Sequence, residues 1–192
     1  EGTITKVMRR NGITTTYEKH LDFDDNFFDN IDSEGKAWMF GYLIGDGCVR
    51  PNSVSITSID LEIMEKCKKL VSFTGNHYTV AKHGSHKEAY VLCLCSRHMV
   101  KRLTEIGCVQ NKTFLTRFPY PNEVPDNLLR HFLRGLLDSD GSWYILNESK
   151  SIQMGLSGTR SLMDGCQQYL ASQGIISSVY NHGNIAITRI GR

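Results

Sequence analysis

A nine-residue stretch that occurs twice constrains the fold of this chain more than any other feature. Residues 39–47 read Met-Phe-Gly-Tyr-Leu-Ile-Gly-Asp-Gly, and residues 133–141 read Leu-Arg-Gly-Leu-Leu-Asp-Ser-Asp-Gly. Asp46 and Asp140 lie 94 residues apart (140 − 46), so the two copies align without an insertion. A long period that is seen only twice indicates a duplicated domain and not a solenoid array.

Each copy of the stretch ends a pattern of apolar residues at helical spacing. The first pattern runs over residues 34–45, with Ser33 in the N-cap position and Gly47 at its end. The second begins at Pro125 and continues over residues 126–138. The sequence therefore predicts two equivalent helices.

Small residues lie four positions apart on both predicted helices. They are Gly41 and Gly45 in the first helix, and Gly135 and Ser139 in the second. A spacing of four places such residues on one helical face. Small faces of this kind allow two helix backbones to approach closely. We therefore expect the helices to pack together, with Gly41 and Gly135 in backbone contact.

This packing would bring the two aspartates to the same depth in the molecule. Asp46 and Asp140 each follow the small face at a C-terminal helix end, where the helix dipole is negative. Two neighbouring carboxylates repel each other unless a cation lies between or beside them. Oxygen ligands favour a hard divalent ion, so the sequence predicts Mg²⁺, with Mn²⁺ and Ca²⁺ as alternatives.

The repeated motif resembles that of the LAGLIDADG homing endonucleases in their single-chain, two-motif form. The resemblance implies an α+β fold of two pseudo-symmetric αββαββ(α) halves with antiparallel β saddles, packed through the motif helices. It also implies that Asp46 and Asp140 bind the catalytic metal, joined by the backbone carbonyls of Gly45 and Ser139. The first motif departs from the family pattern at Ile44, where an acid is usual.

Alternating and helical patterns divide the rest of the chain into matching parts. We expect LAGLIDADG half one at 34–118 and half two at 119–192. The expected strands are 48–50, 54–57, 77–82, 89–95, 142–145, 151–156, 175–181 and 184–190; the further helices are 60–71, 97–106 and 159–173. Only half one has a helix after its second hairpin, which predicts that the natural chain continues past residue 192 with a terminal helix.

Two segments precede the first half. Residues 1–17 contain a short basic helix closed by Asn11-Gly12, which is predicted to be the end of a helix-turn-helix or, equally, a surface amphipathic helix. Residue 1 would then lie within a longer natural chain. Residues 18–33 are acidic and are interpreted as a linker that docks through its apolar residues, Phe23, Phe27, Phe28 and Ile31.

The resemblance implies a sequence-specific endonuclease that hydrolyses both strands of a DNA duplex as a monomer. Lys112 follows the place of a basic-pocket lysine that stabilises the phosphate, with a solvated lysine as the alternative. Ser55 and Met154 are assigned to the strand positions that organise water. Because thioether sulfur is a poor partner for water, the two half-sites are predicted to differ.

The strands of the two saddles are expected to lie in adjacent major grooves, where polar side chains contact bases and phosphates. The predicted DNA-binding residues are Arg50, Asn52, Ser53, Ser55, Lys82, His83, His86, Lys87, Trp143, Tyr144, Asn147, Lys150, Gln153, His182, Asn184 and Arg189.

Composition excludes several other classes of protein. The net charge of +2 is low for a nucleic-acid binder, but the acidic segment hides a more basic remainder. The sequence has no run of 18 apolar residues and no signal peptide, so we expect an intracellular protein without a membrane partner. A zinc site of Cys93 and Cys95 with His83 and His86 is disfavoured, because the thiols alternate with leucines on a strand.

Two hypotheses about function remain. The first is the metal-dependent DNA endonuclease, with a role in intron or intein mobility. The second is a regulator or an RNA-splicing cofactor (maturase) that uses the same scaffold without cutting. The intact pair of Asp46 and Asp140 favours the first hypothesis.

Overall fold

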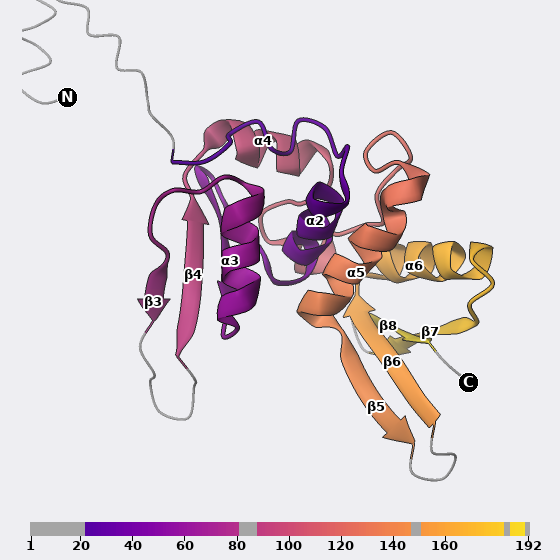
Figure 1. Ribbon diagram of the computed structural model, residues 1–192. Coiled ribbons are helices and arrows are strands. Elements are labelled where there is room, and N and C mark those ends of the chain that lie inside the picture. The colour runs from indigo at the N-terminus through magenta and orange to yellow at the C-terminus, as the bar shows by residue number, and fades with distance from the viewer. Residues whose placement is uncertain (1–21, 81–87, 147–150, 183–184, 191–192) are drawn as a thin grey trace, which may run out of the picture.

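The computed structural model describes residues 22–80, 88–146, 151–182 and 185–190. The predicted basic helix near the N-terminus and the first residues of the acidic linker lie outside these ranges. The described chain forms two halves, which flare apart below a central pair of helices (Figure 1). Among the described residues, no helix is long and apolar enough to cross a membrane.

The two halves repeat one order of elements. Half one consists of α2 (Glu34–Asp46), β1 (Cys48–Arg50), β2 (Ser53–Ser58), α3 (Leu61–Leu70), β3 (Tyr78–Val80), β4 (Ala89–Leu94) and α4 (Arg97–Glu105). Half two consists of the 3₁₀ turn η2 (Asp126–Leu128), α5 (Leu129–Asp140), β5 (Ser142–Leu146), β6 (Ser151–Gly158), α6 (Arg160–Ser172), β7 (Ser177–His182) and β8 (Ile185–Ile190). A further 3₁₀ turn, η1 (Lys112–Phe114), lies in the connector between the halves.

Each half builds one four-stranded antiparallel sheet. The strand orders are β1-β2-β4-β3 and β5-β6-β8-β7, so equivalent strands take equivalent places. The predicted α+β fold of two repeated halves is therefore confirmed. Some boundaries differ: the second motif helix begins with the 3₁₀ turn η2 and becomes α-helical only at Leu129, and β7 starts at Ser177, two residues later than expected.

Helices α2 and α5 pack against each other through their glycines, as the sequence predicts. A methyl group added at Gly41 would overlap the carbonyl oxygen of Phe132, and one added at Gly135 would overlap that of Trp38. These contacts are reciprocal because residues 38 and 132 are equivalent in the two motifs. The two halves are thus related by a pseudo-twofold axis between the helices.

The faces of the first sheet differ in burial because side chains alternate along each strand. Val49, Val54 and Leu94 point to the side covered by helices and are buried. Ser55 and Cys93 point to the opposite, open side, where they are partly exposed. The open sides of the two sheets are the surfaces on which polar residues can meet a large ligand.

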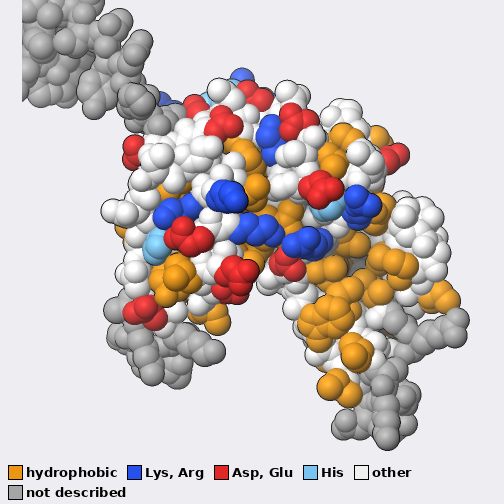
Figure 2. Space-filling model, in the orientation of Figure 1, with side chains coloured by type: hydrophobic (Ala, Val, Ile, Leu, Met, Phe, Trp, Pro, Cys, Tyr) orange, Lys and Arg blue, Asp and Glu red, His pale blue; other side chains and the backbone are white. Residues whose placement is uncertain are grey.

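The second sheet carries an exposed apolar surface. Trp143, Ile145 and Ile152 lie on the same side as the buried Leu156, which α6 covers, yet all three are exposed. Figure 2 shows hydrophobic side chains gathered over β5 and β6 on the lower right of the view.

Candidate active site

Two aspartates stand at equivalent helix ends. Asp46 is the last residue of α2, and Asp140 is the last residue of α5. In both cases the following glycine is extended and donates its backbone N–H to a leucine carbonyl, Leu43 for Gly47 and Leu137 for Gly141. The backbone therefore leaves both helices in the same conformation, and the carboxylates of Asp46 and Asp140 occupy equivalent positions at the two helix ends.

The small residue before Asp46 allows the second acid to approach the first helix. A methyl group added at Gly45 would overlap the hydroxyl of Ser139 and would lie 3.1 Å from a carboxylate oxygen of Asp140. The Ser139 hydroxyl donates to the Leu136 carbonyl at 3.0 Å, which holds the Ser139 side chain against the backbone of α5. Close packing of the helices thus brings the acids of the two halves together.

Burial and mutual repulsion change the acidity of this pair. Partial burial raises the pKa of Asp46 above its ordinary value, and the negative charge of Asp140 raises it further. Burial also raises the pKa of Asp140. The ammonium of Lys112 opposes both shifts. A divalent cation at this place would have the same effect as the lysine, but with a larger charge.

Lys112 binds the C-terminal end of α2. Its Nζ donates to the carbonyls of Leu43 and Ile44 at 2.7 Å each, and also to the carbonyl of Gly45. The Leu43 carbonyl also accepts from the Gly47 N–H that caps the helix, whereas Ile44 and Gly45 lie in the last turn, where helix carbonyls lack a following N–H. Burial lowers the pKa of Lys112, while the two aspartates and two cysteines raise it. The lysine therefore holds a positive charge between the helix end and the acid pair.

The donor set fits a hard divalent ion only in part. Within the described residues, no group of three or more His, Cys, Asp and Glu side chains could hold a metal ion. Two carboxylates are nevertheless typical ligands for Mg²⁺, which retains waters and takes further oxygens from a phosphate. The Gly45 carbonyl, predicted as a ligand, accepts from Lys112 in this structure.

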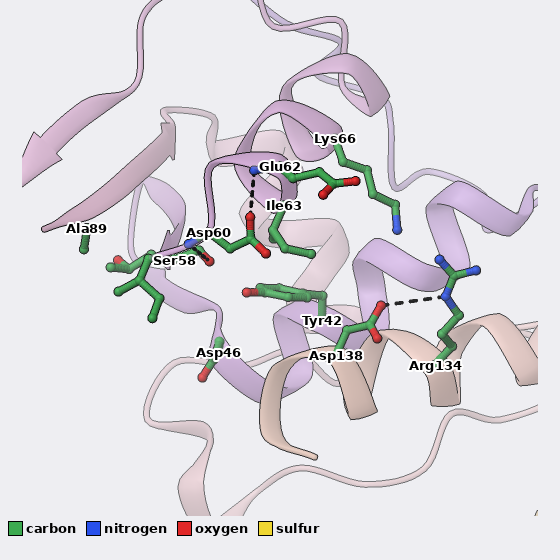
Figure 3. Close-up of a pocket in the computed structure, with 12 residues that line it drawn as sticks. Tyr42, Asp46, Ser58, Asp60, Glu62, Ile63, Lys66, Ala89, Arg134 and Asp138 are labelled. Carbon is green, nitrogen blue, oxygen red and sulfur yellow. Dashed lines mark hydrogen bonds and ion pairs between the residues drawn. The ribbon is translucent and has the colours of Figure 1, made fainter. Parts of the chain in front are cut away.

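A groove of about 820 Å³ extends from Asp46 along the front of the helix pair (Figure 3). Lys66 lies over the ring of Trp38, with its Nζ 3.2 Å from the ring centroid. Trp38 donates from Nε1 to Asp138 at 2.7 Å, and Arg134 lies 3.7 Å from the same carboxylate oxygen. Sequence reasoning missed this cluster, because it joins α3 of one half to α5 of the other.

The predicted DNA-binding residues fall into three groups. Arg50, Ser53 and Ser55 lie on the open side of the first sheet, and Tyr144 and Gln153 lie on the open side of the second. Asn52, in the β1–β2 turn, accepts a hydrogen bond from Nε of Arg97 at 2.7 Å. The structure does not describe Lys82, His83, His86, Lys87, Asn147, Lys150 and Asn184, nor the side chains of His182 and Arg189.

Two assignments change because the strand register is now known. Trp143 pairs with Met154 on the side of the sheet that faces α6, opposite to Tyr144, so it does not share a surface with the other expected base contacts. Met154 is likewise not the equivalent of Ser55. Ser55 pairs with Cys48, and the residue that pairs in this way with Ser142 is Gly155.

The six cysteines form no disulfide. The sulfurs of Cys93 and Cys95 lie 3.9 Å apart on the open side of the first sheet. The histidines suggested as their partners in a zinc site lie outside the described residues. Burial raises the pKa of the Cys67, Cys108 and Cys166 thiols to about 12, so these three are inert core residues.

Comparison with known proteins places this geometry in context. A family model described as a LAGLIDADG-like domain matches residues 34–107 and 127–190. The chain is similar to the homing endonuclease I-WcaI bound to its DNA recognition sequence, with a TM-score of 0.60 and 13% identity over 86% of this chain and 80% of that one. No curated protein matches the chain.

Other solved structures have the same fold at similarly low identity. Mesophilic variants of the homing endonuclease I-DmoI give a TM-score of 0.56 and 15% identity, over 82% of this chain and 88% of that one. Full-length DUF199/WhiA from Thermatoga maritima gives a TM-score of 0.54 and 12% identity, over 88% of this chain but only 55% of that one.

Proposed function

The chain belongs to the LAGLIDADG-like domain family, and from this premise we propose that it is a sequence-specific endonuclease that cuts both strands of DNA. The observation that carries the proposal is the pair of Asp46 and Asp140 at equivalent helix ends. A protein that only binds DNA does not need two repelling carboxylates at the junction of its halves. One acid beside each of two antiparallel strands would let a single chain cut both.

The open sides of the sheets support DNA as the substrate. They flare away from the acid pair on both sides, so a duplex lying across them would present its backbone to the helix ends (Figure 1). Polar residues line these surfaces, including Ser55 and Tyr144. The similar I-WcaI structure has DNA bound, and I-DmoI has been solved with DNA and Mn.

Asp46 and Asp140 would hold divalent cations, Mg²⁺ foremost, with Gly45, Ser139 and phosphate oxygens completing the ligands. Bound there, the metal supplies Lewis-acid activation of water and relief of charge on the leaving oxygen. The protein's own contribution is to fix both carboxylates at one level by close helix packing. Lys112 holds a positive charge beside them, which stabilises negative charge on a phosphate.

The test compares the wild-type protein with a double variant, Asp46→Asn, Asp140→Asn, on duplexes selected by binding from a randomised library. We expect the wild type to cut both strands in Mg²⁺ and the double variant to lose at least three orders of magnitude in rate, since metal activation contributes several kcal/mol. Affinity for DNA, measured in Ca²⁺, should change little, because most contacts come from the strands.

Asp138→Asn is the matched control, since Asp138 lies on α5 two residues before the acid and accepts from Trp38, which Asn also permits. Its cleavage rate should stay within a few-fold of wild type. Full cleavage by the double variant would exclude these acids from catalysis. Tight, specific binding without any cleavage by the wild type would favour the second hypothesis, a binding protein built on this scaffold.

A further inference from the structure

The two half-sites differ at one strand position next to the acids. Cys48 pairs with Ser55 on the open side of the first sheet, and Ser142 pairs with Gly155 on the open side of the second. Cys48 and Ser142 each follow their aspartate by two residues. The Ser55 hydroxyl on the open side of the first sheet therefore has no counterpart at the equivalent position of half two.

A tyrosine occupies the space that Gly155 leaves. A methyl group added at Gly155 would lie 3.0 Å from Cε2 of Tyr144, 3.3 Å from Oγ of Ser142 and 3.7 Å from the Tyr144 hydroxyl. The phenol of Tyr144 thus lies where the side chain of a serine at position 155 would lie. Any residue larger than glycine would crowd the ring.

The Tyr144 hydroxyl is held in place by its neighbour on the strand. Ser142 donates from Oγ to this hydroxyl at 2.9 Å, and its Oγ also lies 3.4 Å from the Gly155 carbonyl. Because Ser142 is nearer to Asp140 than Tyr144 is, the ring folds back along β5 toward the acid. With Ser142 as the donor, the phenolic proton is available to a water or to a phosphate oxygen.

The same open side borders the cavity at the second acid. Ser157, which lies on the side of β6 shared with Gly155, lines a cavity together with Asp140 and Lys112. The Tyr144 hydroxyl therefore stands on the surface that leads to Asp140. In half one, Arg50 occupies the position equivalent to Tyr144, so the two halves combine different residue pairs: Arg50 with Ser55, and Tyr144 with Gly155.

We propose that Tyr144, held by Ser142 over Gly155, is the positioning residue of the second half-site, supplying the hydroxyl that Ser55 supplies in the first. This inference rests on the proposed nuclease function. The hydroxyl orients the attacking water or the scissile phosphate of the strand served by Asp140. Orientation of this kind lowers the barrier without forming a bond to the substrate.

The experiment measures nicking of each strand separately on an end-labelled target duplex. Tyr144→Phe removes only the hydroxyl and should slow one strand about a hundred-fold, the lower end of the loss seen when a single oriented donor is removed. Ser55→Ala should slow the other strand. Tyr120→Phe, at an exposed tyrosine of the connector outside both sheets, is the control and should change neither rate. Affinity for DNA in Ca²⁺ and the thermal midpoint should remain near wild type in all three variants.

A rescue variant separates positioning from a merely structural role. Tyr144→Arg alone should slow the Asp140 strand, and adding Gly155→Ser to it transplants the half-one pair and should restore much of the rate. An unchanged strand ratio in Tyr144→Phe, or equal slowing of both strands, would overturn the inference while leaving the nuclease intact. A wild-type protein that nicks neither strand would overturn the proposed function and this inference together.

Discussion

The two halves agree at their shared interface and differ at their outer layers. Val49 of half one has only 6% of its surface exposed, whereas Trp143, its equivalent in half two, has 70% exposed. In half one, α4 packs on β2, the strand that pairs with the strand of Val49. Among the described residues of half two, no helix follows β8 to do the same. Within the described residues, the two halves therefore match where they touch across the axis and differ in how much of the outer side of each sheet is covered.

A second difference lies beside the motif helices. Phe118 of the connector packs on Phe132 and Tyr169 in half two, and a methyl group at Gly165 would overlap it. In half one, the equivalent of Phe132 is Trp38, which lies under the ammonium of Lys66 at the edge of an open groove. Apolar side chains cover one side of the helix pair, whereas the other side is an open polar groove. The stability of the first side therefore depends on apolar burial, and that of the second on polar contacts.

The largest expected effect tests the part that the halves share. Gly41→Ala and Gly135→Ala should each destabilise the protein by about 3 kcal/mol, because the added methyl group meets a backbone carbonyl that cannot move alone. Helix propensity by itself would give the opposite sign, about 1 kcal/mol of stabilisation. Urea unfolding measures both variants, and equal losses are expected if the axis relates the halves.

Gly35→Ala on α2 is the control for these variants. Its added methyl group meets only the end of the Leu70 side chain, which can rotate away, so its effect should be below about 1 kcal/mol. Glycine-to-alanine changes at 41 and 135 that prove as mild as this one would contradict close backbone packing of the helices.

The next effect compares the closed and open sides of the helix pair. Phe118→Ala should cost about 2 kcal/mol, less than a fully buried phenylalanine because this ring is half-buried. Lys66→Ala should cost less than about 1 kcal/mol, the value of a partly exposed cation–π contact. Thermal unfolding of both variants shows which side of the helix pair contributes more to stability. A larger loss of stability for Lys66→Ala than for Phe118→Ala would contradict our interpretation that the groove side contributes less.

A smaller effect compares the first sheet, which is buried at Val49, with the second sheet, which is exposed at Trp143. Val49→Ala should destabilise by about 1.5 kcal/mol, since two buried carbons are removed beneath the helices. Trp143→Ala should lie within about 0.5 kcal/mol of wild type, although the side chain removed is much larger, because most of it is in solvent. A large loss for Trp143→Ala would mean that this surface is covered in solution.

The smallest effect concerns the pH dependence of the acids without metal. A carboxyl group with a raised folded-state pKa holds its proton more tightly when folded, so its ionisation destabilises the fold at neutral pH. Asp46→Asn and Asp140→Asn should therefore each gain about 0.5 kcal/mol at pH 7, after allowance for solvent screening. The gain should shrink as the pH falls through the raised folded-state pKa and vanish below the ordinary value of 3.8. Unfolding in EDTA at pH 4 and pH 7 measures it.

The sequence predicted those features that local patterns encode. The repeated motif, the small helical faces and the succession of helices and strands along the chain follow from residue spacing. The contact at Gly41 and Gly135 was predictable because small residues at a spacing of four leave room for a second helix backbone. The equivalence of Ser55 and Gly155 was not, since the two first hairpins differ in loop length and register cannot be counted across them. The three carbonyls bound by Lys112 depend on tertiary packing that no local pattern contains.

The two tryptophans provide separate optical reports on the two regions compared above. Trp38 is buried at the helix interface, with an ammonium above its ring and its indole N–H bound to a carboxylate. Trp143 is largely in solvent, so its emission should be red-shifted and open to quenching by acrylamide. A ligand or segment that covers the α6 side of the second sheet would shift the emission of Trp143, whereas separation of the two halves would expose Trp38 to the quencher. Fluorescence alone can therefore tell which region responds first.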